Sequence, residues 1–270
     1  MFDDYLERWS LVPDGQPVIT HSSRLLPVLW RAKPAMLKIA LAEEEKCGGE
    51  VLQWWDGEGA ARVYARENDA LLLELATGGR SLSSMAVSGE DDGASRIICH
   101  VVSALHQPRG ALMPILAPLR NWFAELEPAA VTHGGVFAEC SAVARALLNE
   151  PQEITALHGD IHHANILDFG DRGWLAIDPK GVLGDPAFDI ANLFYNPVES
   201  EFRTSEARAV SMATILAERL RCDIGKVLDY AFAFPALSAS WHLEDGNNEE
   251  ASRSLAVGRA VGAARRQVRS

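Results

Sequence analysis

Residues 157–179 read LHGDIHHANILDFGDRGWLAIDP and place Asp160, Asn165 and Asp178 within one short stretch. Apolar residues flank these side chains, and the run before Asp178 has the pattern of a short strand. Carboxylate and amide oxygens suit Mg²⁺, which usually keeps waters and substrate phosphates as its other ligands. The stretch therefore predicts phosphoryl transfer. Asp160 would lie where an acceptor hydroxyl binds, and Asn165 and Asp178 would hold a metal ion between them.

These residues also resemble a known family. The HGD motif ending at Asp160, with Asn165 and Asp178, is similar to the catalytic and metal loops of the aminoglycoside phosphotransferases in the protein-kinase-like superfamily. GWLAIDPKGVLGDPAFDIANLFYNP (173–197) and LSASWH (237–242) resemble the subgroup of streptomycin 6-kinases and hydroxyurea phosphotransferases. The resemblance implies that Asp160 is the catalytic base and that Asn165 and Asp178 bind Mg²⁺ next to ATP.

The resemblance also implies an α+β, two-lobe, protein-kinase-like fold. Residues 1–77 would form a small nucleotide-binding lobe, an antiparallel sheet with one helix, that ends in a hinge. Residues 78–270 would form a larger, mainly helical lobe for catalysis and substrate binding. The apolar periodicity agrees, because it predicts helices at 94–105, 118–126, 135–148, 205–220, 224–234 and from 249 onward.

Histidines near the HGD motif leave a second interpretation open. An H-x-D-x-H-H cluster could ligate Zn²⁺ in a hydrolase, and its members are His158, Asp160, His162 and His163. A zinc site would give no function to the amide and carboxylate that follow, so phosphoryl transfer is favoured. In that interpretation His158 packs and forms hydrogen bonds rather than transferring a proton.

Lys38 lies in the apolar run AMLKIA at 35–40, which predicts a strand. A buried lysine must be paired, so Lys38 is expected to meet nucleotide phosphates and a carboxylate. The following helix, expected from Ala42 to Trp55, supplies several glutamates. Of these, Glu45 is the expected partner of Lys38, although glutamates at a helix start are also favoured there by the helix dipole.

Two further segments are expected to contact the nucleotide. The turn at 21–25 has no Gly-rich loop, so backbone groups and the hydroxyls of Ser22 and Ser23 would cover the phosphates. The apolar strand at 69–75 leads into the hinge, where backbone groups from Glu74 to Ala76 would bind adenine. A plain core strand followed by a turn explains this second segment equally well.

Composition indicates a globular protein in a reducing compartment. Of the 270 residues 48% are hydrophobic, and the four cysteines are scattered without C-x-x-C spacing. The N-terminus is acidic, and no apolar run approaches the roughly 20 residues that cross a bilayer. The expectation is a cytoplasmic monomer or weak dimer with no membrane partner. Residues 88–95, SGEDDGAS, are expected to form an exposed acidic loop.

The net charge of −12 disfavours nucleic acid as a partner and suits a small cationic substrate. Acids and amides gather beside an aromatic residue in the segment 241–250, and carboxylates bind guanidinium and ammonium groups well. The same segment could instead be a solvated helix start. The expected substrate-binding residues are Trp241, Glu244, Asp245, Glu249 and Glu250.

The sequence thus predicts a phosphotransferase that uses ATP and Mg²⁺ and acts on a hydroxyl of an aminoglycoside. The first expectation is phosphorylation of the 6-oxygen of streptomycin, which would give antibiotic resistance. A kinase for hydroxyurea or another small metabolite is the alternative. The zinc hydrolase and a nucleotide-binding pseudokinase without activity also stay open.

Overall fold

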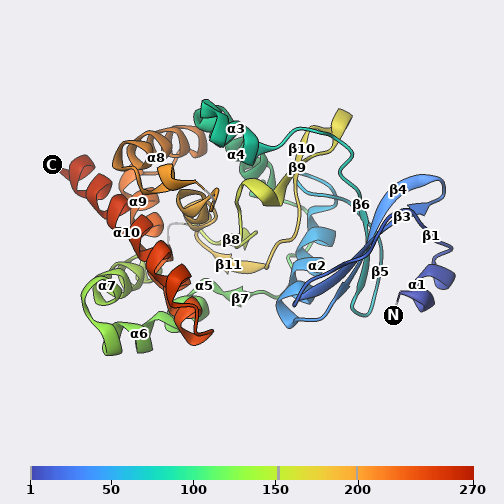
Figure 1. The fold of residues 1–270 in the computed structure, drawn as a ribbon, viewed down its shortest axis with the longest axis horizontal. Helices are drawn as coiled ribbons and strands as arrows, with labels where there is room; N and C mark the ends of the chain where they lie inside the picture. Colours follow the sequence, from blue (N-terminus) through green and yellow to red (C-terminus); the bar gives the residue numbers. More distant parts are fainter. Residues whose placement is uncertain (1, 151–152, 199) are drawn as a thin grey trace.

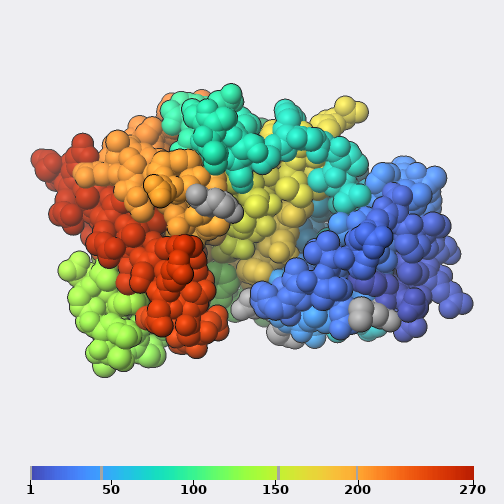
Figure 2. Space-filling view, in the orientation of Figure 1, coloured from blue at the N-terminus to red at the C-terminus, as the bar shows by residue number. Residues whose placement is uncertain are grey.

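The computed structural model describes residues 2–150, 153–198 and 200–270, and it has two parts. An antiparallel sheet from the N-terminal third lies at one end, and a larger helical body lies at the other (Figure 1). In the space-filling view, residues from the middle of the chain, drawn yellow, lie between the two ends (Figure 2). This is the two-lobe α+β arrangement that the sequence predicts.

The N-terminal sheet has the strand order β1-β3-β4-β6-β5, and β2 pairs with β3 beside β1. Its long central pair is the hairpin of β3 and β4, in which Leu25 lies opposite Lys38. A short helix, α1 (Asp3–Arg8), precedes the sheet. The strands are β1 (Val12–Pro13), β2 (Val18–Ile19), β3 (Ser23–Trp30), β4 (Lys33–Ala40), β5 (Val63–Glu67) and β6 (Ala70–Glu74).

Alternation along β4 decides where Lys38 points. Successive side chains of a strand face opposite sides of the sheet. Ala35 and Leu37 pack in the small core that α1 covers. Met36 contacts the main core on the other face, where α2 (Glu43–Trp55) buries Trp55. Because Lys38 shares the register of Met36, its side chain is directed toward α2.

The helical body surrounds the main apolar core. Much of α9 (Ile224–Glu244) is buried in this core, including Tyr230, Phe232 and Phe234. It packs against α10 (Asn248–Arg269) and α7 (Gly135–Asn149). The other helices are α3 (Leu82–Met85), α4 (Asp91–Leu105), α5 (Leu119–Ala124), α6 (Leu126–His133) and α8 (Glu206–Leu220).

Short strands between the two parts carry the loops that the sequence analysis singles out. β7 (Ala117–Pro118), β11 (Val182–Gly184) and β8 (Thr155–Leu157) form one small sheet, and β9 (Ile166–Asp168) pairs with β10 (Trp174–Ala176) in a hairpin. The remaining turns are helical: η1 (Ala86–Glu90), η2 (His163–Asn165), η3 (Gly170–Arg172), η4 (Pro186–Phe188), η5 (Ala191–Tyr195) and η6 (Glu201–Thr204).

The prediction of an exposed acidic loop at 88–95 is wrong. Apart from a kink at Gly89, this segment is helical and forms the end of η1 and the start of α4. Asp91 lies in the first turn of α4, where a negative charge is favoured by the helix dipole. Its carboxylate also binds Arg208 through two hydrogen bonds, of 2.7 and 3.1 Å. These interactions hold a Gly- and Asp-rich segment in a helix.

Two helix boundaries also differ from expectation. The helix expected at 224–234 continues through Pro235 to Glu244, and the buried residues that follow the proline hold this second half against the core. The helix expected at 118–126 is divided into α5 and α6. A proline cannot continue a helix, so Pro151 is expected to end the helix that the sequence predicts at 135–148, but it lies outside the described residues. Among the described helices, none is both long enough and apolar enough to span a membrane.

Candidate active site

The loop between β8 and β9 carries Asp160, and a buried carboxylate holds its backbone. Asp189 accepts hydrogen bonds from the Gly159 N–H at 2.7 Å and from the His158 N–H at 2.9 Å. Gly159 has a φ of +83°, and a Cβ there would lie 3.1 Å from the Trp122 ring. Only glycine adopts this backbone conformation without strain in the space available. The turn at Gly159 sets the direction in which the next residue, Asp160, leaves the loop.

Asp160 accepts hydrogen bonds from two side-chain amides. Asn192 Nδ2 donates to its Oδ1 at 2.8 Å, and Asn165 Nδ2 donates to its Oδ2 at 3.1 Å. Burial raises the pKa of Asp160 to about 7; Asp178 acts in the same direction, and Lys180 and the two amides oppose it. A positioned carboxyl group with a pKa near neutrality can accept a proton at physiological pH.

Asn165 and Asp178 lie at neighbouring strand ends, where the Ile177 N–H donates to the Asn165 carbonyl at 2.9 Å. The Asn165 amide nitrogen faces Asp160, so its side-chain oxygen is left for another partner. Asp178 has a φ of +59°, which is uncommon for a residue with a side chain. One amide oxygen and one carboxylate are a donor set that fits a hard cation such as Mg²⁺.

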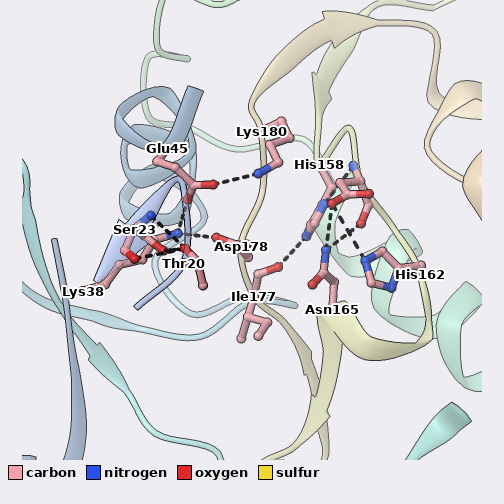
Figure 3. Close-up of polar contacts among 11 residues, drawn as sticks. Thr20, Ser23, Lys38, Glu45, His158, His162, Asn165, Ile177, Asp178 and Lys180 are labelled. Atoms are coloured by element: carbon pink, nitrogen blue, oxygen red, sulfur yellow. Dashed lines mark hydrogen bonds and ion pairs between the residues drawn. The ribbon is translucent and has the colours of Figure 1, made fainter. Parts of the chain in front are cut away.

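Glu45 lies between two lysines, as Figure 3 shows. One of its oxygens pairs with Lys38 of β4, and the other accepts a hydrogen bond from Lys180 Nζ at 2.8 Å. The ion pair that the sequence analysis expects between Lys38 and Glu45 is therefore present. Lys38 also pairs with Asp178. Burial alone would raise the pKa of Asp178, but the two lysines lower it overall, so its carboxylate stays charged.

The histidines do not assemble the alternative zinc site. His158 hydrogen-bonds through Nε2 to the Ile177 carbonyl and accepts the Asp160 N–H at Nδ1. His163 is buried on another side, 3.9 Å from Asp91. Within residues 2–150, 153–198 and 200–270, no three His, Cys, Asp or Glu side chains converge as metal ligands.

Two cavities open beside Asp160 and share Phe234, Trp241 and Asp245. The acidic cavity, of about 460 Å³, has the carboxylates of Glu125, Asp160, Glu244 and Asp245 in its wall. The second cavity, of about 440 Å³, also has Asp160 and Asp245 in its wall, but the rest of its lining is mostly amide, hydroxyl, imidazole and apolar groups, including Asn192 and Ser238. A larger cavity, of about 910 Å³ near His106, contains none of the expected site residues.

The expected substrate residues separate into two groups. Trp241, at the end of α9, donates a hydrogen bond from Nε1 to Glu125, and Glu244 and Asp245 line the acidic cavity with it. Glu249 and Glu250 lie in the first turn of α10, pair with Arg253 and line neither cavity beside Asp160.

The expected nucleotide contacts are placed as follows. The Ser23 hydroxyl is buried and lies 3.2 Å from the Thr20 hydroxyl, while the Ser22 carbonyl accepts the Leu41 N–H. The Glu74 N–H donates to the Arg62 carbonyl, and the Glu74 carboxylate pairs with Arg172.

Ala76, where the sequence predicts a hinge, packs with a small apolar cluster that contains Phe169 and Leu175. The residues that form the core of this cluster are buried, so Ala76 lies against apolar side chains. No backbone hydrogen bond of Ala76 to another described residue occupies its polar groups.

Sequence reasoning missed Asn192 and Lys180. Asn192 lies 32 residues after the aspartate that it contacts, and Lys180 lies 135 residues after Glu45. Lys180 follows the predicted metal ligand Asp178 by two residues. A lysine at this position is a signal in the sequence that places a second positive charge, beside that of Lys38, in the site. Asn192 had no comparable signal.

Comparison with known proteins agrees with this geometry. The family model of aminoglycoside/hydroxyurea antibiotic resistance kinases matches residues 8–246. The chain belongs to this family. It is therefore a kinase of the aminoglycoside phosphotransferase type, as the sequence predicts.

Two curated relatives of this kinase cover most of its length. The streptomycin 3''-kinase of Klebsiella pneumoniae is 45% identical over 89% of this chain and 92% of its own. The streptomycin 6-kinase of Streptomyces griseus is 31% identical over 95% of this chain and 86% of its own.

A solved structure of aminoglycoside phosphotransferase APH(4)-Ia, a thermostable mutant in ternary complex with AMP-PNP and hygromycin B, is similar in fold. The TM-score is 0.66, the sequence identity is 13%, and the similarity covers 97% of both chains. The kinase therefore has the two-lobe, protein-kinase-like fold that the sequence predicts.

Proposed function

We propose that this kinase transfers the γ-phosphoryl group of ATP to a hydroxyl of streptomycin. One observation carries the proposal: Asp160 lies in the wall of an acid-lined cavity and is hydrogen-bonded to Asn165, next to the cluster of Lys38, Glu45 and Asp178. An acceptor in the cavity and a nucleotide over the cluster would meet at Asp160.

In the proposed reaction, Asp160 orients the acceptor hydroxyl and takes its proton as the oxygen attacks the γ-phosphorus. The bond between that phosphorus and the β–γ bridging oxygen breaks, and its electron pair leaves with ADP. The amides of Asn192 and Asn165 hold the carboxylate in position. Holding the reacting groups in line is the main contribution that a protein makes to this chemistry.

For the nucleotide, Lys38 would bind phosphate oxygens, and Asn165 and Asp178 would hold Mg²⁺. When bound, Mg²⁺ supplies charge neutralisation of the phosphates. We place the phosphates under the turn that contains Ser22 and Ser23, and the adenine beside Ala76 and its apolar cluster. The division into a nucleotide lobe at 1–77 and an acceptor lobe at 78–270 belongs to the same proposal.

The acceptor would be cationic because the acidic cavity presents carboxylates to it. Glu125, Glu244 and Asp245 can accept charge-assisted hydrogen bonds from guanidinium or ammonium groups. Two adjoining cavities of more than 400 Å³ each suit a multi-ring antibiotic. Hydroxyurea is too small to fill them, so we rank it second as the acceptor.

Two relatives that match most of this chain are named after different hydroxyls of streptomycin. The relative that is 45% identical is named a 3''-kinase, and the one that is 31% identical is named a 6-kinase. We therefore propose the 3''-hydroxyl as the phosphorylated position, ahead of the 6-hydroxyl that the sequence analysis expects.

The test is Mg²⁺-ATP turnover by purified protein with streptomycin, other aminoglycosides, hydroxyurea and simple amino alcohols. We expect streptomycin-dependent ADP release, and a phosphate on the 3''-oxygen in ¹H–³¹P correlation spectra of the product. Asp160→Ala should bind AMP-PNP as tightly as the unaltered protein and release no ADP. Turnover by this variant, or no turnover of streptomycin by the unaltered protein, contradicts the proposal.

A further inference from the structure

The backbone of Lys180 is fixed next to the loop of Asp160. Its N–H donates to the His158 carbonyl at 2.7 Å, and the Gly181 N–H donates to the same oxygen at 3.3 Å. The backbone of Lys180 is therefore hydrogen-bonded to the HGD motif. Its position relative to Asp160 is set by backbone hydrogen bonds and does not depend on side-chain packing alone.

The Lys180 ammonium group shares its carboxylate partner with a second lysine. It donates to one oxygen of Glu45, and Lys38 pairs with the other oxygen. Glu45 is buried, with 1% of its side chain exposed. Lys38 has a second carboxylate partner in Asp178, whereas Glu45 is the one carboxylate that pairs with Lys180 among the described residues. Since an ammonium group has three N–H donors, Lys180 keeps donors for an anion bound between the lobes.

Lys180 faces the acceptor side of the site, and Lys38 faces the nucleotide side. The Lys180 side chain is 20% exposed and lines the acidic cavity together with Asp160 and His21. Among the described residues that line the two cavities beside Asp160, Lys180 is the one Lys or Arg. The catalytic loop from His158 to Asn165 supplies no Lys or Arg of its own.

We propose that Lys180 is a second catalytic lysine, which binds the transferring phosphoryl group from the acceptor side. This proposal rests on the proposed function. The Lys180 ammonium group would bind the equatorial oxygens of the phosphoryl group while its bond to ADP breaks and its bond to the acceptor oxygen forms. Charge spreads over these oxygens in the transition state, and a preorganised cation there stabilises it.

The competing explanation is that Lys180 only keeps Glu45 in place for Lys38. The two roles predict different losses. A purely structural role would weaken nucleotide binding through Lys38, whereas a phosphoryl-binding role would leave the affinity for ADP unchanged and weaken only the transition state.

The test compares Lys180→Gln, which keeps a hydrogen-bond donor for Glu45 but removes the charge, with the unaltered protein and with Lys33→Gln. Lys33 is exposed on the β3–β4 hairpin and serves as the matched control. Titrations with Mg²⁺-ADP are made alone and with aluminium fluoride, a planar mimic of the transferring group. This readout needs no acceptor, so it stays informative if streptomycin is not the substrate.

We expect Lys180→Gln to bind Mg²⁺-ADP within threefold of the unaltered protein, and to lose most of the extra affinity that aluminium fluoride gives. Its turnover should fall about 100-fold or more, in the range observed when one transition-state donor is removed. Lys180→Arg should recover part of the loss. An unchanged response to aluminium fluoride in Lys180→Gln, or a parallel loss of ADP affinity, overturns the proposal.

Discussion

Asp189 joins Gly159 of the catalytic loop to His106, the residue that follows helix α4. Its Oδ1 lies 2.7 Å from the Gly159 nitrogen, and its Oδ2 accepts a hydrogen bond from His106 Nε2, also at 2.7 Å. Burial would raise the pKa of Asp189, but His106 and its other partners lower it overall, so the carboxylate is charged inside the protein. The position of Asp160 thus depends on one buried charge that does not touch the substrate.

Replacing Asp189 by Asn should therefore destabilise the protein and slow turnover. The amide of the Asp189→Asn variant would point an N–H donor at the backbone N–H groups that Asp189 binds as an acceptor. Breaking a buried charge pair typically lowers the free energy of unfolding by about 3 kcal/mol. Urea denaturation and steady-state kinetics measure both effects. Asp171→Asn, at an exposed position in η3, is the control that should behave like the unaltered protein. Unchanged unfolding of the Asp189 variant would refute this role.

Asn192→Ala should lower kcat about 10-fold to 100-fold and leave the KM for ATP unchanged. The variant removes the amide that holds Asp160 Oδ1, so the carboxylate can rotate away from the acceptor. Asn192→Asp should be worse, because it places two carboxylates in contact. Asn149→Ala, at an exposed position, is the control. A raised KM for ATP with normal kcat would assign Asn192 to the nucleotide instead.

The stability of the protein without ligands should fall in mild acid partly because of His162. Burial lowers the pKa of His162 to about 4. The unfolded chain takes up this proton near pH 6.5, whereas the folded protein does so only near pH 4. Between these values the unfolded state binds more protons, so stability decreases as the pH falls, by at most about 1.4 kcal/mol per pH unit.

His162→Asn tests this contribution, because Asn can still accept the Ala164 N–H that His162 Nδ1 accepts at 3.2 Å. Unfolding free energies are measured from pH 7 to pH 4, and the variant should show the shallower slope. His100→Asn, at an exposed position, should keep the slope of the unaltered protein. Equal slopes for His162→Asn and the unaltered protein would mean that His162 is protonated alike in both states.

Two glycines in helices should respond in opposite ways to alanine. A Cβ at Gly48 of α2 would lie 1.9 Å from the Pro179 carbonyl oxygen, so the loop of Asp178 must shift. Gly48→Ala should destabilise the protein by about 1–3 kcal/mol and raise the KM for Mg²⁺-ATP. At Gly93 of α4 the nearest atom is Met85 Cε at 3.7 Å, an ordinary contact.

Gly93→Ala should therefore stabilise the protein by about 0.5–1 kcal/mol, since alanine favours the helix. Thermal unfolding of the two variants side by side makes the comparison. If both variants were stabilised, the close contact between α2 and the Asp178 loop would not exist in solution.

The parts of the site that were predictable are local in sequence or follow from strand alternation. Asp160, Asn165 and Asp178 lie within one stretch. Lys38 and Glu45 are seven residues apart, and the alternation of β4 directs the lysine toward α2.

The parts that were not predictable depend on contacts between distant segments. Residues 88–95 have the composition of a loop, but the ion pair between Asp91 and Arg208 spans 117 residues. Glu250 is expected to contact the substrate, and the structure adds two partners that the sequence does not indicate, Arg253 and the Tyr195 hydroxyl. Local patterns cannot show such partners.

The residues that we assign to the transfer step and those that line the acidic cavity come from different segments. Asp160, Asn165 and Asp178 lie on loops of the small central strands, whereas Glu125 follows α5 and Trp241 and Glu244 end α9. Substitutions at these helix ends could change which antibiotic fits without disturbing the transfer machinery. In clinical or environmental variants of this kinase, a shift in resistance spectrum should therefore be traced first to residues 122–125 and 241–245.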